Sequence, residues 1–293
     1  MPFQFNIHPH WFKGNTHIHT TLSDGGKTLA EVTELYGSAG YHFLVATDHF
    51  IASDVNAHDR PAAPLLWLDG IELDGEEEGH LFHIVCIGRF EGISPQLSLA
   101  QSIESVHAQN GVLILAHPFW SGNTFPDTQR WPFNGVEIYN HVCQWLNGKG
   151  DGRVYWNYML NQPASAGVFA IAADDAHLRP EHPGWNGGWI MVNAPELTTE
   201  AITQAIRQGN FYSSCGPEFN TLAYDGEALH FTCSAVQFVR LVGPAYRGER
   251  LGSFSGELIN EGKLSLQADW SYCYLEIEDA YGRRAWTNNL ITP

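Results

Sequence analysis

Apolar runs alternate with helix-like patterns along the chain up to about residue 215. The runs have the length and composition of buried strands. They are FLVAT (43–47), LLWLDGIEL (65–73), LFHIVCIG (81–88), GVLILAH (111–117), NGVEIYN (134–140) and VFAIAAD (168–174). Strands that alternate with helices predict a parallel sheet covered by helices, either open or closed into a barrel.

Four segments before, between or after these runs have the apolar periodicity of helices. Thr28 followed by Glu31 has the pattern of a capping box, and Gly111 and Gly209 follow two of the segments as helix stops. The predicted helices cover residues 29–40, 98–110, 154–161 and 199–208. The first part of the chain is therefore predicted to be an α/β domain.

The pattern changes after about Glu218, where apolar and polar residues alternate and no segment favours a helix. The alternating runs are ALHFTCSAVQFVRLVG (228–243), KLSLQADW (263–270) and YCYLEIEDAYGRRAW (272–286). Alternation with a period of two, interrupted by turn signals, predicts strands. We therefore predict two domains, an α/β domain over residues 1–217 and a small all-β domain over 218–293.

Composition narrows the class of protein. The 293 residues are 44% hydrophobic and 13% aromatic, which is enough for a sizeable core, and the formal net charge is −17. This charge argues against nucleic-acid polymers and membrane surfaces as partners but leaves a small anionic substrate possible. We predict a cytoplasmic protein, because the cysteines are scattered, no apolar run approaches 20 residues and the N-terminus is unlike a signal peptide. The cysteines are Cys86, Cys143, Cys215, Cys233 and Cys273.

Histidine is unusually frequent, with 15 residues, and two of the histidines stand one residue apart. His17 and His19 precede a Ser-Asp-Gly turn that contains Asp24. Alternate residues of a strand share one face, so both imidazoles are expected to point the same way and to begin a metal site. A second such pair, His8 and His10, contains a proline and lacks the following Ser-Asp-Gly, so we do not expect it to bind metal.

Other ligand-type side chains stand at or beside the predicted strands, mostly at the carboxyl ends. In parallel α/β folds these ends meet at one rim. A single zinc-like ion uses three or four protein ligands, so nine candidates predict two or three ions, with Glu72 able to bridge. The candidate metal ligands are His17, His19, Asp24, His49, Glu72, His83, His117, Asp175 and His177.

Three local alternatives accompany this set. His83 is preferred over His80 because it stands directly at the apolar run. Asp175 is preferred over Asp174 because Asp175 and His177 share a face. Asp48 is expected to orient a ligand or to cap a turn without binding metal itself.

The order of these motifs resembles that of the polymerase and histidinol phosphatase (PHP) family. H-x-H with S-D-G, T-D-H, G-I-E, H-I-V, A-H-P and D-x-H follow one another over residues 14–215. The resemblance implies a distorted (β/α)7 barrel, two or three divalent ions (manganese, iron or zinc) and phosphoester hydrolysis. Residue by residue, the motifs fall on the nine ligands named above.

Four longer segments resemble the carbaryl-hydrolase-like (CehA/McbA) branch of that family. They are GNTHIHTTLSDG (14–25), GYHFLVATDH (40–49), GNFYSSCGPE (209–218) and DAYGRRAWTNN (279–289). That branch also has a small β domain after the barrel, which fits the predicted domains. It includes carbamate hydrolases, so phosphoester chemistry is not the only expectation.

No serine or cysteine nucleophile motif is evident, so a metal-bound hydroxide is the expected nucleophile. Glu72, Asp175 and His177 are the predicted catalytic residues. The candidate substrate-binding residues are Arg179, Arg130 and Ser213.

The first expected activity is a phosphoesterase acting on a small phosphorylated metabolite. The alternative is hydrolysis of a carbamate, amide or aryl ester. A non-enzymatic metal-binding protein would be expected to lack ligands, and none is missing. The expected partner is a small, anionic molecule, and a homo-oligomer is possible. The C-terminal segment contains only His230 and is expected to supply no metal ligand.

Overall fold

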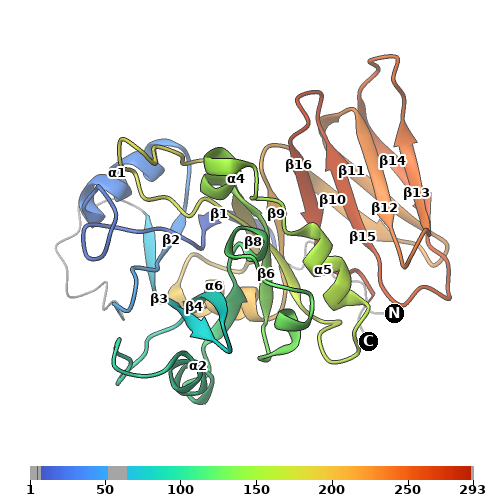
Figure 1. The fold of residues 1–293 in the computed structure, drawn as a ribbon. Coiled ribbons are helices and arrows are strands. Elements are labelled where there is room, and N and C mark those ends of the chain that lie inside the picture. The colour runs from blue at the N-terminus through green and yellow to red at the C-terminus, as the bar shows by residue number, and fades with distance from the viewer. Residues whose placement is uncertain (1–4, 6–7, 52–64, 292–293) are drawn as a thin grey trace.

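A thirteen-stranded sheet runs through the computed structural model, which describes residue 5 and residues 8–51 and 65–291 (Figure 1). A separate three-stranded sheet lies beside its C-terminal strands. The described part of the chain is thus a mixed α/β structure with a β-rich C-terminal region, and no helix in it is long and apolar enough to cross a membrane.

The predicted helices are all present, with small shifts at their ends. Over the first part of the chain the elements are β1 (His10–Asn15), α1 (Leu29–Ser38), β2 (Phe43–Ala46), β3 (Leu66–Glu77), β4 (His80–Ile87), α2 (Leu99–Ala108), β5 (Val112–Leu115), α3 (Pro118–Ser121), the 3-10 helix Pro126–Gln129, β6 (Gly135–Asn140), α4 (His141–Asn147), α5 (Arg153–Leu160), β7 (Phe169–Ala173), β8 (Trp189–Ala194), α6 (Thr199–Arg207) and β9 (Phe211–Ser214). The later strands are β10 (Phe219–Tyr224), β11 (Ala228–Val236), β12 (Phe238–Val242), β13 (Gly248–Gly252), β14 (Ile259–Ser265), β15 (Tyr274–Glu278) and β16 (Arg284–Thr287).

The large sheet is mixed, which corrects the prediction of a parallel sheet. Its order is β13-β12-β15-β16-β9-β8-β1-β2-β3-β4-β5-β6-β7, and only β1–β2, β2–β3, β5–β6 and β6–β7 pair in parallel. Strand β4 returns antiparallel along β3 because only Glu78 and Gly79 join them, both with positive φ. A two-residue connection of this kind permits only a hairpin.

The sheet curves so that β7, the last strand in its order, approaches β9. Ser213 Oγ on β9 donates to the Ala170 carbonyl on β7 at 2.7 Å and accepts from the Ala172 amide at 2.9 Å. Just beyond β1 and β7, Ile18 forms a parallel bridge with Ala176. Among the described residues no continuous ladder joins β7 to β8 or β9, so the ladders form a curved open sheet and do not establish the predicted closed barrel.

Two core clusters fix the strands whose ends build the site. One packs β3–β6 against α2 and α5, and includes the fully buried Trp156. The other gathers apolar side chains of β2–β5, β7 and β8 around Ile202 and Ile206 of α6. Because neighbouring residues of a strand such as Ile84 and Val85 enter different clusters, a one-residue slip would misplace both cores.

The C-terminal strands continue the main sheet, since β16 pairs with β9 between Trp286 and Ser213. The buried Asn288 side chain accepts from the Ala170 amide at 2.9 Å and donates to two carbonyls that follow α6. The run predicted over 228–243 is divided at Gln237 into β11 and β12, and β10 and β13 were not predicted. Residues 219–291 contain no helix, and the domain boundary at 217/218 stays a prediction.

Candidate metal centre

The structure brings all nine predicted ligands into one cluster. Each lies within 3.6 Å of at least one other member, measured between a ring nitrogen and a carboxylate oxygen. They come from the segments after β1, β2, β5 and β7 and from the β3–β4 hairpin. Residues that are up to 160 positions apart in the chain therefore share a single site.

Glu72 lies at the centre of the cluster and is 1% exposed. Its Oε2 atom lies 3.1 Å from Nε2 of His17, 3.1 Å from Nε2 of His19 and 3.4 Å from Nε2 of His49. One carboxylate oxygen thus faces three imidazole nitrogens.

The second oxygen of Glu72 faces the other side of the cluster. Oε1 lies 2.9 Å from Nδ1 of His83 and 3.6 Å from Nε2 of His117. The indole of Trp120 stands edge-on to both imidazoles, with ring centroids 5.9 Å and 5.2 Å away. An aromatic wall therefore borders this half of the cluster.

Asp175 forms a second carboxylate centre. Its Oδ1 atom lies 3.3 Å from Nε2 of both His17 and His19 and 3.6 Å from Nδ1 of His177. Its Oδ2 atom lies 3.6 Å from Nε2 of His117. His17 and His19 are thus shared between Asp175 and Glu72.

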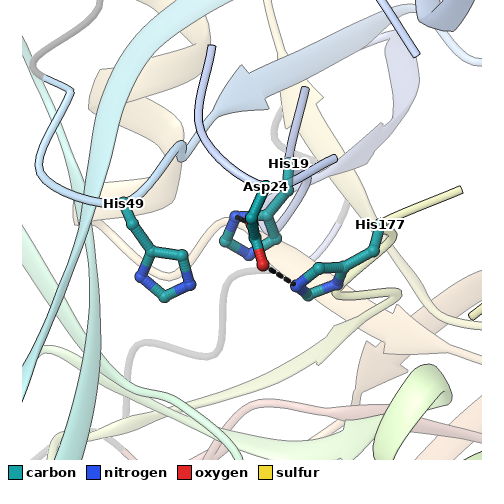
Figure 2. A group of neighbouring side chains, drawn as sticks. All are labelled: His19, Asp24, His49 and His177. Carbon is teal, nitrogen blue, oxygen red and sulfur yellow. Dashed lines mark ion pairs between the residues drawn. The ribbon is translucent and has the colours of Figure 1, made fainter. Parts of the chain in front are cut away.

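A third group, drawn in Figure 2, includes Asp24, the most exposed member of the cluster. Asp24 is half-exposed, and its Oδ2 atom lies 3.3 Å from Nε2 of His177 while Oδ1 lies 3.4 Å from Nδ1 of His19. The ring of His19 stacks on His177 at 4.3 Å and on His49 at 4.7 Å between centroids. These four side chains offer ligand atoms that all lie within 4.8 Å of one another.

His17 and His19 lie just beyond β1, which ends at Asn15, so the prediction that they stand within a strand is wrong. The segment is still extended enough for the alternation to hold. Ile18 between them is fully buried in a different direction and bridges Ala176. The two imidazoles therefore point together, as the pattern predicted.

Asp48 shapes the turn that carries Asp24. It accepts hydrogen bonds from the Thr20 amide at 2.8 Å and from the Ser23 amide and hydroxyl at 3.1 and 2.7 Å. A Cβ at Gly25 would overlap the carbonyl of His19, which explains the glycine of the Ser-Asp-Gly turn. Asp48 thus caps the turn that carries Asp24, which is one of the two roles expected of it.

Asp174 and Asp175 have separate surroundings. Asp174 is fully buried and accepts from Asn15 Nδ2 at 2.7 Å, Tyr36 Oη at 2.8 Å and the Gly187 amide at 2.7 Å. Burial raises the pKa of Asp174, and these hydrogen bonds partly oppose that rise. Asp174 therefore holds neighbouring segments together while Asp175 faces the imidazoles.

Two members of the cluster have left-handed backbone conformations. His117 has φ +25° and Asp175 has φ +58°. Residues other than glycine rarely adopt positive φ, and such conformations persist where the surroundings impose them, often at functional sites. The backbone at the ends of β5 and β7 is thus held in a shape that aims both side chains into the cluster.

The electrostatics of the cluster favour bound positive charge. Burial alone would lower the pKa of His17 and His19, but Asp175 and Glu72 raise the pKa of His17 well above its usual value and that of His19 to about 9. Although burial opposes it, the imidazoles keep the pKa of Glu72 and Asp175 well below the usual carboxyl range.

The residues fit divalent cations. His17 Nε2 and both ring nitrogens of His19 are buried without a hydrogen-bond partner among the described residues, although carboxylate oxygens lie close by. Imidazole nitrogens with carboxylate oxygens are the ligands of zinc, manganese and iron sites. Cations between them would satisfy the orphaned nitrogens and balance the carboxylates.

Sequence reasoning missed two buried neighbours of the cluster. Glu137 on β6 is 1% exposed, with Oε1 2.8 Å from Nδ1 of His17 and Oε2 accepting from the His117 amide at 2.9 Å. Cys143 Sγ lies 3.9 Å from Oδ2 of Asp175. The available signal was a carboxylate in the middle of the otherwise apolar run GVEIY.

The predicted substrate-binding residues separate into two groups. Arg179 is partly exposed, and its Nη2 atom lies 3.8 Å from Asp24 Oδ2, at the edge of the cluster. Arg130 instead pairs with Glu78 at 2.7 Å beside the β3–β4 turn, and Ser213 is buried with its hydroxyl bonded to the backbone of β7. The described contacts bring neither of these two to the nine side chains.

The alternative histidines lie elsewhere. His80 Nδ1 lies 2.7 Å from Asp127 Oδ2, whereas His83 faces Glu72. His230 pairs with Asp225 at 2.6 Å on the exposed surface of the C-terminal region. Among the residues described after 218, none belongs to the cluster.

No protein-family model matches this sequence, and a comparison with curated proteins finds no match either. Among solved structures, the fold is similar to that of a two-domain protein from Bacteroides vulgatus containing a predicted PHP-like metal-dependent phosphoesterase. The TM-score is 0.55 at 15% identity, over 94% of each chain. The shared fold therefore extends through both the α/β part and the C-terminal β region.

Two further structures are similar over part of the chain. One is a predicted metal-dependent phosphoesterase from Bifidobacterium adolescentis, with a TM-score of 0.41 and 14% identity over 59% of this chain and 90% of that one. The other is an amidohydrolase from Chromobacterium violaceum with bound sulfate and no metal, with a TM-score of 0.46 and 15% identity over 68% and 96%.

Proposed function

We propose that this protein is a metal-dependent hydrolase of the PHP family. The observation that carries the proposal is the position of Glu72, whose Oε2 atom lies 3.1 Å from Nε2 of both His17 and His19 inside a buried cluster. Burying these imidazoles and carboxylates costs free energy unless they are paired or bind cations. The cluster has no evident structural purpose that would offset this cost. The motif order and the shared fold support the same family.

The nine side chains would hold two or three ions of manganese, iron or zinc. Glu72 would bridge two of them through oxygens that face different imidazoles, and Asp175 would complete the buried side. Asp24 and His177 would hold the solvent side. When bound, divalent ions lower the pKa of water and neutralise negative charge on the attacked group.

The preferred substrate class is a small phosphorylated metabolite. Arg179 stands at the exposed edge of the cluster, and its guanidinium can bind phosphate oxygens in a bidentate manner.

We further assign the curved sheet to a distorted (β/α)7 barrel and the chain to the carbaryl-hydrolase-like branch. Its partner would be a small molecule, with no nucleic-acid polymer or membrane involved, in a chain that can form homo-oligomers.

A carbamate, amide or aryl-ester substrate is the second candidate. The contact between Asp24 and Arg179 partly neutralises this guanidinium, and Arg130 is held by Glu78 beside the hairpin turn. Among the described residues, the cluster thus has little positive charge to offer a phosphate beyond the ions themselves. That balance is the observation in favour of a neutral carbonyl as the second candidate, whereas the guanidinium of Arg179 keeps a phosphate as the first.

A substrate panel with added metal tests the proposal. Metal-depleted protein is supplied with Mn²⁺ or Zn²⁺ and assayed against phosphate monoesters and an aryl N-methylcarbamate, with phosphate and phenol release measured. Hydrolysis of either substrate class supports the proposal if it requires metal and is lost in Glu72→Gln. Whether the phosphate monoester or the carbamate is hydrolysed decides between the two candidate functions. The control is Glu276→Gln, a buried carboxylate on β15 that contacts no member of the cluster. Turnover unaffected by metal or by Glu72→Gln would contradict the proposal.

A further inference from the structure

We infer that Glu137 is a positioning residue that fixes the ring of His17 and the backbone of His117 within the metal centre. The inference rests on the proposed metal centre and adds to it a residue that the motif set does not contain. It is built from three hydrogen-bond contacts of one buried carboxylate.

The first contact sets the proton position on His17. The His17 ring lies between two carboxylates on opposite edges, with Nδ1 2.8 Å from Glu137 Oε1 and Nε2 3.1 Å from Glu72 Oε2. The Glu137 carboxylate accepts a hydrogen bond from Nδ1–H of His17, which leaves the lone pair on Nε2. The ring is then fixed in the tautomer and orientation that a cation beside Glu72 requires.

The second contact holds a strained backbone. Glu137 Oε2 accepts from the amide of His117 at 2.9 Å, and His117 has φ +25°. A conformation of this kind costs free energy and needs neighbouring groups to impose it. One carboxylate therefore reaches two predicted ligands, one through its ring and the other through its main chain.

The third contact connects Glu137 to Asp175. Asn140 is fully buried, and its Nδ2 atom donates to Glu137 Oε2 at 2.8 Å and lies 3.3 Å from Asp175 Oδ2. The Asn140 side chain is itself fixed, because its Oδ1 atom accepts from the Cys143 amide at the start of α4. Strand β6 thus supports the cluster through two adjoining side chains.

Glu137 is placed to support ligands and not to bind a cation itself. It lies on the Nδ1 edge of His17, away from the oxygens of Glu72 and Asp175 that face Nε2. Both of its oxygens are already occupied by hydrogen-bond donors. No ion pair among the described residues joins it to a lysine or arginine, so its burial is compensated by the site alone.

Glu137→Gln in the full chain tests this role by metal affinity, independently of any substrate. Metal-depleted protein is titrated with Zn²⁺ in competition with a chromophoric chelator, and the bound ions are counted at saturation. We expect the tightest Zn²⁺ to bind about 10- to 100-fold more weakly, with the number of ions unchanged. Glu276→Gln, another buried carboxylate changed to an amide, should leave the affinity unchanged.

Each other result contradicts the inference. An affinity within a few-fold of wild type means that Glu137 does not position the ligands, and loss of one whole ion at saturation means that it is a ligand. If wild type itself fails to bind Zn²⁺, the proposed metal centre is wrong and this inference falls with it. Should Glu137→Gln not fold, ¹⁵N-histidine spectra of Zn²⁺-loaded wild type decide. We expect the His17 proton on Nδ1, and a proton on Nε2 overturns the inference.

Discussion

His17 and Glu72 approach each other to 3.1 Å between Nε2 and Oε2, and neither side chain is more than 1% exposed. In a metal-depleted protein this contact requires a buried proton, whereas in a loaded protein a cation would lie between the two atoms. We therefore predict at least two divalent ions per chain, because nine ligand side chains exceed the needs of one ion. Elemental analysis of metal-replete protein measures this number, and one ion or fewer would disprove the cluster.

Glu72→Ala should reduce activity on the order of 100-fold or more, since loss of a supporting residue around a metal already costs 10- to 100-fold. It should also remove more metal than Asp24→Ala, because Glu72 faces five imidazoles and Asp24 faces two. Glu137→Ala should also weaken the site, because Glu137 Oε1 lies 2.8 Å from Nδ1 of His17. Elemental analysis of folded protein measures the metal content. Equal metal loss in Glu72→Ala and Asp24→Ala would mean that Glu72 does not bridge two ions.

The metal-depleted protein should lose stability as the pH rises. The pKa of His19 is raised in the folded state from its ordinary value of 6.5 to about 9. Its contribution is therefore fully present below about pH 6.5 and is lost as the pH rises through 9. Urea unfolding between pH 6 and 9.5 should show the free energy of unfolding falling on the order of a few kcal/mol. Saturating Zn²⁺ should remove this trend, and a constant or rising free energy without metal would contradict it.

Arg179→Ala should raise KM for a phosphorylated substrate about 10-fold or more, because a charge-assisted contact to phosphate would be lost. Arg130→Ala is the matched control, since its guanidinium pairs with Glu78 beside the hairpin turn and should not affect KM. Steady-state kinetics of both variants separate the two arginines. Equal effects, or an unchanged KM in Arg179→Ala, would remove Arg179 from the substrate site.

Asn288→Ala should lower the free energy of unfolding by about 2–3 kcal/mol, because three backbone groups near β7 and β9 would lose a buried partner. Asn260→Ala, at an exposed position of β14, is expected to have little effect. Thermal and urea unfolding compare them. Zn²⁺ stoichiometry should be unchanged in both, and loss of bound ions in Asn288→Ala would indicate that the C-terminal region shapes the metal site.

Much of the α/β part was predictable because its signals are local. Thr28 and Glu31 form the expected capping box, with Glu31 Oε2 accepting from the Thr28 amide at 2.9 Å. Strand directions were not predictable from alternation alone, since an apolar run looks the same in either direction. The Glu78-Gly79 turn contained the one local sign of an antiparallel return, because a short loop with positive φ makes a hairpin.

The metal cluster was predicted by residue type and position, yet its supporting residues were not. Glu137 lies within an apolar strand and belongs to no motif, so only the fold shows that it faces His17. Ser213 was a candidate substrate-binding residue, but β9 is buried along its whole length and directs that hydroxyl to β7. In both cases long-range packing decided where the side chain points.

The β3–β4 hairpin has a consequence for the order in which the site forms. Glu72 and His83 are 11 residues apart and meet across neighbouring strands, so a nascent chain can bring them together early. His17 and Asp175 are 158 positions apart and meet only when the chain between them has folded. A partly folded chain would thus expose a fragment with few ligands and weak, unselective affinity. Secure capture of the correct ions would have to await folding of the whole α/β part, making metal loading a late step in maturation.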